Sequence, residues 1–216
     1  MVQLNHKNGK MLTKKQIELL RPFQSNVFKE YSFREIARLA SEKSHNALQT
    51  ALKQFAKEKI ISEHKVGTSK LYKIKLDNDL SYDYLSLIKY SQLPVQVVYS
   101  IEALKKEIEK HSLFYSLVIF GSYSDGKQTK NSDLDIAIFI PDNTQEKNMK
   151  IAVNSALSSS LIPLHVQIIS HNDFFSMLVN KQPNLGKEIA FKHRAIQNIN
   201  IFYKLIKKAM EHGFNY

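Results

Sequence analysis

Residues 120–135 read FGSYSDGKQTKNSDLD, and this stretch decides the fold of the carboxyl-terminal half. Its glycine and serine come directly after an apolar run, Leu113 to Phe120, which predicts a strand. It closes with Asp133 and Asp135, one residue apart, at the start of a second apolar run. Because side chains alternate along a strand, both carboxylates should lie on one face, and Leu134 should point to the other.

Each part of this stretch has a chemical use. At Gly121 the missing side chain would let a phosphate approach the backbone closely. Ser122 offers a hydroxyl and an amide at the start of a short helix, whose positive end favours an anion. Two neighbouring carboxylates repel each other unless a cation lies between them, and magnesium prefers carboxylate and phosphate oxygens. The stretch therefore predicts a metal at Asp133 and Asp135 beside a polyphosphate.

The pattern resembles the signature of the nucleotidyltransferase superfamily of the DNA polymerase beta type. The elements of that signature are Gly-Ser, a short helix containing glycine, and Ser-Asp-x-Asp leading into a strand. The match is closest to the small stand-alone enzymes called minimal nucleotidyltransferases, and covers about residues 97–180. The resemblance implies transfer of a nucleoside monophosphate from a magnesium-bound nucleoside triphosphate to a hydroxyl, at a site of two metal ions.

The resemblance also assigns roles to residues. Asp133 and Asp135 would be catalytic and would bind the metal, and Gly121, Ser122 and Ser132 would bind the nucleotide. One alternative stays open: the glycine and serines could form an ordinary surface turn, with Ser132 capping it locally.

A third carboxylate, which active members carry on the next core strand, is not evident. The matching strand lies within 162–170, where His165 takes the place and Gln167 is the other inward candidate. A neutral imidazole can act as a base or bind some metals, but it suits magnesium poorly. His165 is therefore a catalytic candidate, or a polar residue at a strand end with no role. We expect the second metal to be weakly held.

The rest of the carboxyl-terminal half alternates between helix and strand patterns. We expect helices over 96–110 and 145–159, and a third strand over 164–169. We expect closing helices over 172–180, 185–193 and 196–212. These elements predict an α/β (α+β) core with a mixed sheet flanked by helices.

The amino-terminal half predicts a winged helix–turn–helix over roughly residues 10–76. A helix over 13–23 precedes a short helix that begins at the capping box of Ser32 and Glu35. A longer helix over 45–59 and a hairpin over 60–75 follow. We therefore expect three segments: a winged-helix domain (1–78), a connector (79–95) and a nucleotidyltransferase domain with carboxyl-terminal helices (96–216).

In such folds the second helix of the pair lies in the major groove of DNA. Six residues of the predicted helix and wing could contact bases or phosphates: His45, Asn46, Gln49, Lys53, Lys65 and Lys70. The charge agrees, because residues 1–95 carry a net charge of +8 and the remainder +3. The alternatives are a winged helix used for dimerisation or protein contact, and a charge that serves solubility.

Composition limits the remaining classes. The chain has 216 residues, a net charge of +11 and no cysteine, which excludes disulfides and thiolate zinc sites. No apolar run is long enough for a membrane helix, and residues 1–10 carry no signal-peptide core. We expect a soluble, cytoplasmic protein that contacts no membrane.

Two functions follow from the sequence. The first is a nucleotidyltransferase guided by a DNA-binding winged helix, whose acceptor and nucleotide base stay open. The second is a DNA-binding transcriptional regulator in which a degenerate core senses a nucleotide or binds a partner. Either could act as a homodimer.

Overall fold

The computed structural model describes residues 12–215. Residues 1–11, which include the start of the predicted winged-helix domain and the stretch inspected for a signal peptide, lie outside the described residues. The chain divides into two compact units. One runs to Ile88 without residues 24–26, and the other contains residues 24–26 and everything from Lys89 onward. Within the described residues, no helix combines the length and the apolar character needed to span a bilayer.

The helices of the first unit are short. They are α1 (Lys14–Glu18), α2 (Arg21–Ser25), α3 (Phe33–Leu39), α4 (His45–Lys57) and α5 (Asp79–Leu87). Ser32 and Glu35 form the predicted capping box at the start of α3. The single helix expected over 13–23 is wrong, because α1 ends before Pro22. Proline has no N–H and its ring would clash with the carbonyl four residues earlier, whereas the first turn of α2 accommodates it.

A three-stranded antiparallel sheet completes the first unit. Its strands are β1 (Tyr31–Ser32), β2 (Ile61–Val66) and β3 (Ser69–Ile74), in the order β1-β3-β2. The tight turn between β2 and β3 uses Gly67, whose φ of +59° lies in the left-handed region. The apolar face of α4 is buried, as its spacing predicts. Helices followed by a hairpin are the expected elements, and the winged-helix identity stays a prediction.

The second unit is built on a mixed four-stranded sheet. Its strands are β4 (Ser116–Phe120), β5 (Leu134–Ile140), β6 (Leu164–Ser170) and β7 (His193–Gln197), in the order β6-β5-β4-β7. The pair β5–β6 is parallel and the other two pairs are antiparallel. This confirms the predicted mixed sheet.

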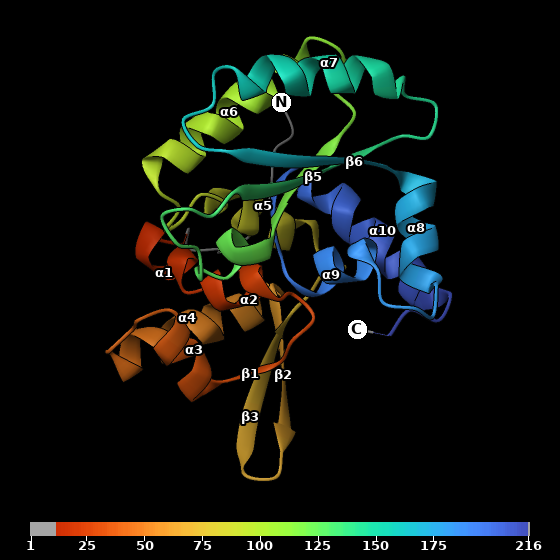
Figure 1. The fold of residues 1–216 in the computed structure, drawn as a ribbon. Helices are drawn as coiled ribbons and strands as arrows, with labels where there is room; N and C mark the ends of the chain where they lie inside the picture. Colours follow the sequence, from red (N-terminus) through yellow and green to blue (C-terminus); the bar gives the residue numbers. More distant parts are fainter. Residues whose placement is uncertain (1–11, 216) are drawn as a thin grey trace, which may run out of the picture. The chain divides into compact units, whose positions relative to one another are not determined.

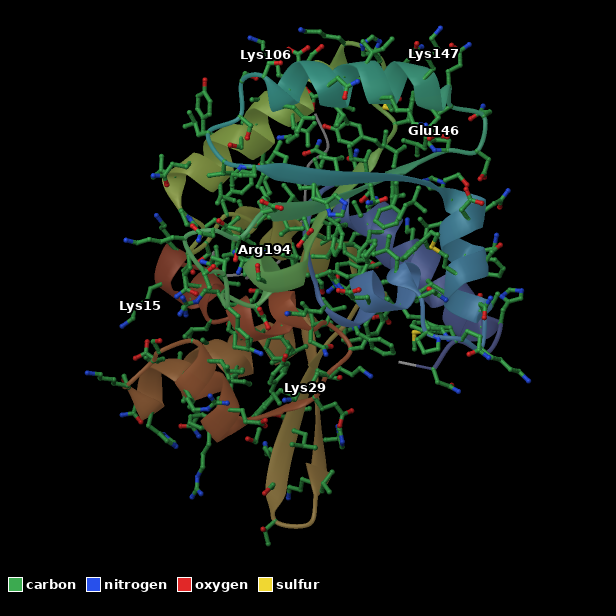
Figure 2. The ribbon with its side chains drawn as sticks, viewed as in Figure 1. Lys15, Lys29, Lys106, Glu146, Lys147 and Arg194 are labelled. Atoms are coloured by element: carbon green, nitrogen blue, oxygen red, sulfur yellow. The ribbon has the colours of Figure 1, made fainter. Side chains whose placement is uncertain are left out.

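Helices cover both faces of this sheet (Figure 1). The helices α6 (Val95–Glu109) and α7 (Glu146–Leu157) lie on one face, and α8 (His171–Val179), α9 (Leu185–Phe191) and α10 (Ile199–Glu211) lie on the other. Leu134 and its alternate neighbours on β5 pack in the core with α6 and α7. On the opposite face the ring of Phe139 lies 4.4 Å from that of Phe174 on α8. Lys106 and Lys147 project outward from α6 and α7 (Figure 2).

The strand β7 corrects the sequence prediction, which extended one helix through His193 and began the next at Ile196. Instead α9 ends at Phe191, β7 occupies residues 193–197, and α10 begins at Ile199. The edge of β4 needs a hydrogen-bonding partner, and β7 supplies it in antiparallel pairing. Pairing with a distant strand thus overrides the helical pattern of the local sequence.

Candidate functional site

The strand β4 delivers the chain to a tight bend that we call the Gly–Ser corner (Gly121 and Ser122). Gly121 has a φ of +63°, which favours glycine, and it opens a four-residue 3-10 helix, η1 (Gly121–Ser124). The Ser124 hydroxyl donates a hydrogen bond of 2.7 Å to the Gly121 carbonyl. The bend is therefore fixed by its own hydrogen bonding, while Ser122 stays partly exposed.

The carboxylate of Asp135 lies directly against this corner. A Cβ atom on Gly121 would fall 2.3 Å from Oδ2 of Asp135, closer than real Cβ contacts allow. Glycine is therefore required here to leave room for the carboxylate, in addition to any room it leaves for a phosphate. Leu134, the preceding residue, is fully buried on the opposite face of the sheet. The alternation expected for this strand thus holds at Leu134 and Asp135.

Asp133 immediately precedes β5 and is exposed. Among the described residues it has no hydrogen-bond or ion-pair partner, so its charge faces water. Ser132 is differently placed. Its hydroxyl accepts a hydrogen bond of 2.9 Å from the Thr129 backbone amide. That is the local capping role which the sequence left open beside nucleotide binding.

His165 stands beside Asp135 on the neighbouring strand. The parallel register pairs the two residues, and Nδ1 of His165 lies 3.0 Å from Oδ1 of Asp135. The amide nitrogen of Gln167 lies 2.9 Å from Nε2 of the same imidazole. Because an amide nitrogen only donates, Nε2 accepts this bond, and the neutral ring donates its Nδ1 proton to the carboxylate. A short chain of hydrogen bonds therefore leads from Gln167 to Asp135.

The donor set suits one hard cation better than two. Asp135 lies beside the corner and Asp133 precedes it by two residues, and both offer the carboxylate oxygens that magnesium prefers as ligands. At the third position the described side chains offer an imidazole already bonded to Asp135, and no group of three His, Asp or Glu side chains within residues 12–215 is arranged to hold a metal. The second ion of a two-metal site therefore lacks ligands in this arrangement.

A second charged group lies at the corner. Asp125 follows η1, and its Oδ2 atom lies 3.2 Å from the ammonium of Lys127 and 3.1 Å from that of Lys192. Burial raises the pKa of Asp125, but the hydrogen bonds from Lys192 and Lys127 outweigh this effect. The pKa of Asp125 therefore lies below its usual value. The position of Lys192 at the corner depends on β7, which the sequence did not predict.

In the first unit the six predicted nucleic-acid contacts are all exposed: His45, Asn46, Gln49, Lys53, Lys65 and Lys70. The first four lie on α4 and the last two on the β2–β3 hairpin. The imidazole of His45 packs against the ring of Phe33, with centroids 4.6 Å apart. Lys70 is partly neutralised, because its ammonium lies 3.0 Å from Glu63.

Comparison with known families agrees with the geometry at the corner. Residues 101–197 match the family described as nucleotidyltransferase domain. The match begins in α6 and ends with β7, so it contains the corner, both aspartates and His165. A comparison with curated proteins finds no match. Residues 101–197 of this chain are therefore similar to a nucleotidyltransferase domain.

Proposed function

We propose that the protein transfers a nucleoside monophosphate from a nucleoside triphosphate to a hydroxyl group and releases pyrophosphate. The observation that carries this proposal is the placement of the Asp135 carboxylate against Gly121, with Asp133 exposed two residues earlier in the chain. An acidic pair next to a tight backbone bend is the arrangement that a metal-bound triphosphate needs. The match to the nucleotidyltransferase domain supports the same reaction.

The site residues would contribute in two ways, by neutralising charge and by positioning the nucleotide. Asp133 and Asp135 would hold a magnesium ion, which when bound neutralises charge on the triphosphate. Gly121 and Ser122 would receive the phosphates through backbone amides and the serine hydroxyl. The acceptor oxygen then bonds to the α-phosphorus, and the bond from that phosphorus to the bridging oxygen of pyrophosphate breaks. Most of the rate would come from alignment and electrostatics.

The proton of the acceptor hydroxyl needs a base. His165 donates from Nδ1 to Asp135, which leaves Nε2 as its basic atom. The Gln167 amide covers that atom at 2.9 Å, so Gln167 must turn away before Nε2 can take the proton. His165 thus has two proposed roles, which are to hold Asp135 in place and to receive the proton.

The proposal is tested by measuring transfer of the nucleoside monophosphate to an acceptor. The protein would be incubated with magnesium, each α-labelled triphosphate and a panel of acceptors that includes nucleic acid ends, protein side chains and aminoglycosides. Attachment of label to one acceptor is the expected result. Loss of attachment in Asp135→Asn and Asp133→Asn would assign the reaction to this site.

A matched control separates chemistry from folding. Asp142 is an exposed carboxylate after β5 in the same domain, so Asp142→Asn makes the same chemical change away from the corner. It should transfer like the wild type. Equal loss in all three variants, or transfer that survives in Asp135→Asn, would contradict the assignment.

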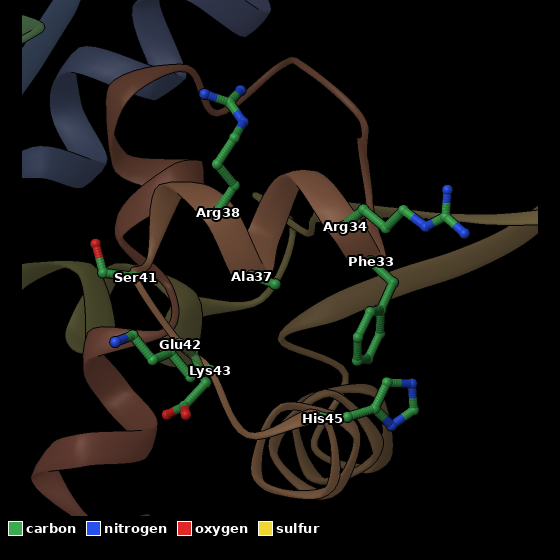
Figure 3. Close-up of a pocket in the computed structure, with 8 residues that line it drawn as sticks. All are labelled: Phe33, Arg34, Ala37, Arg38, Ser41, Glu42, Lys43 and His45. Carbon is green, nitrogen blue, oxygen red and sulfur yellow. The ribbon is translucent and has the colours of Figure 1, made fainter.

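A second candidate function is nucleic-acid binding by the first unit, as in a regulator. It is favoured by a surface pocket of about 620 Å³ between α3 and the start of α4 (Figure 3). Arg34, Arg38 and Lys43 line it, and the charged side chain of none of them has a hydrogen-bond or ion-pair partner among residues 12–215. In Figure 3 the ring of Phe33 faces His45 at one side of the pocket. Unpaired cations beside an aromatic pair suit phosphates and bases.

Nucleic-acid binding would be tested by fluorescence anisotropy with duplex DNA, single-stranded DNA and RNA at several salt concentrations. A steep fall of affinity with salt is expected if phosphates are contacted. Absence of binding at low salt would remove this candidate without affecting the transferase proposal.

A further inference from the structure

We infer that Lys192 binds the β- or γ-phosphate of the nucleotide, and that Asp125 holds its ammonium ready at the Gly–Ser corner and releases it to the nucleotide. The inference rests on the proposed nucleotide site and adds a residue to it. Two independent observations place Lys192 there, namely the strand register and the ion pair.

The register comes first. In the antiparallel pair of β4 and β7, Phe120 lies opposite His193. The next residues outward are Gly121 on one chain segment and Lys192 on the other, so the backbone of Lys192 adjoins the corner. The position follows from the sheet and does not depend on the conformation of the lysine side chain.

The ion pair then fixes the side chain. The ammonium of Lys192 lies 3.1 Å from Oδ2 of Asp125, the residue directly after η1. The Lys192 side chain keeps 40% of its surface exposed, so a ligand can reach it. Lysine at a phosphate site acts as a mobile point charge, which suits an ammonium that exchanges one anion for another.

The local charge favours that exchange. The same Oδ2 atom also takes the ammonium of Lys127, at 3.2 Å. Two cations therefore share one carboxylate, so the group of Asp125, Lys127 and Lys192 carries one excess positive charge. A polyphosphate brings several negative charges to this place, so it can take Lys192 while Lys127 continues to neutralise Asp125.

This arrangement predicts effects of opposite sign. If Lys192 binds phosphate, removing it weakens the nucleotide complex, whereas removing the charge of Asp125 frees Lys192 and strengthens the complex. If the ion pair only stabilises the loop, either substitution removes that stabilising contact, and both substitutions weaken the nucleotide complex. The sign of the Asp125 effect therefore separates the two roles.

The experiment is calorimetric titration of the full chain with magnesium and a mono-, di- and triphosphate series of one base. The base is first chosen as the tightest of ATP, GTP, CTP and UTP on the wild type. We expect Lys192→Met to weaken triphosphate binding by about 10-fold or more and monophosphate binding by less than about 2-fold. We expect Asp125→Asn to tighten triphosphate binding by about 3-fold.

Two controls accompany these variants. Lys204→Met removes an exposed lysine on α10 and corrects for the change in net charge. Lys192→Arg keeps the cation and should stay close to wild type, which guards against a folding defect in Lys192→Met. Thermal unfolding of each variant shows that the domain is intact.

The outcomes distinguish this inference from the function on which it rests. A wild type that binds none of the four triphosphates overturns both. A wild type that binds, with Lys192→Met unchanged or with Asp125→Asn weakened in parallel, overturns the role of Lys192 alone. Loss confined to the triphosphate in Lys192→Met, with a gain in Asp125→Asn, supports it.

Discussion

The carboxylate of Asp135 fills the space that a side chain on Gly121 would occupy, since a Cβ atom there would lie 2.3 Å from Oδ2. The acidic residue and the bend that would receive the phosphates are therefore fitted to each other by packing. A change at either residue should disturb both stability and function.

Gly121→Ala is expected to lose transfer and to destabilise the protein. Gly67→Ala is a matched control, because Gly67 has nearly the same φ, +59° against +63°, but no atom lies within 4 Å of its added Cβ. The backbone strain alone costs about 1–2 kcal/mol at either glycine. The displaced carboxylate should add about 1–3 kcal/mol at Gly121. Urea unfolding measures the stability of the Gly121→Ala and Gly67→Ala variants. Equal losses of stability in the two would show that the Asp135 side chain moves aside at no energetic cost.

His165→Asp would supply the carboxylate that the third position lacks. We expect the number of bound manganese ions, counted by electron paramagnetic resonance with a triphosphate present, to rise from one to two. Transfer should increase by about 10-fold or more, because a second ion can lower the pKa of the acceptor hydroxyl. His165→Asn keeps a donor near Asp135 without adding charge, and should bind one ion. A count of two ions in the wild type would contradict the single-ion reading of the site.

His193 should make the fold sensitive to acid. The side chain is completely buried, with Nδ1 2.8 Å from the Ala190 carbonyl and Nε2 3.2 Å from the Tyr203 hydroxyl. Burial lowers its pKa from 6.5 to about 4, so the unfolded chain binds the proton more readily than the folded one. The stability that His193 contributes is therefore complete above pH 6.5 and declines as the pH falls to about 4, by about 3 kcal/mol in all.

The comparison that checks this is chemical unfolding between pH 4 and 8. His193→Gln keeps hydrogen-bonding capacity but does not titrate, so its stability should depend less on pH than that of the wild type. His111→Gln, at an exposed site in the same domain, should follow the wild type. Identical pH profiles for all three proteins would rule out His193 as the source.

Lys53→Ala should weaken nucleic-acid binding several-fold if α4 contacts phosphates. The slope of log affinity against log salt should fall by about 1. Lys147→Ala removes an equally exposed lysine from α7 in the other unit and should leave both quantities unchanged. A reduced slope in both variants would indicate attraction by net charge instead of a contact.

Local signals in the sequence predicted several elements closely. The apolar run that follows Asp133 forms the strand β5 (Leu134–Ile140), because a long apolar run on a buried strand is a strong local pattern. The capping box at Ser32 is also a local pattern, and it marks the start of α3. The mixed sheet was expected from the resemblance to nucleotidyltransferases.

Other features depend on distant partners, which local patterns do not record. β7 forms because β4 offers a free edge, so its residues read as helix when taken alone. The position of Lys192 at the corner follows from the same pairing. The need for glycine at position 121 was assigned to an approaching phosphate, whereas the packed carboxylate of Asp135 also requires it.

The pairing of β4 with β7 has a consequence for biosynthesis. A ribosome makes β4 long before β7, so a nascent chain holds β4 with one outer edge open until residues 193–197 have emerged. Chains that stop before residue 193 would keep Asp133, Asp135 and His165 but would lack the strand that closes the sheet. Such fragments should aggregate or be degraded, and the nucleotide site would become complete only after residues 193–197 have been made.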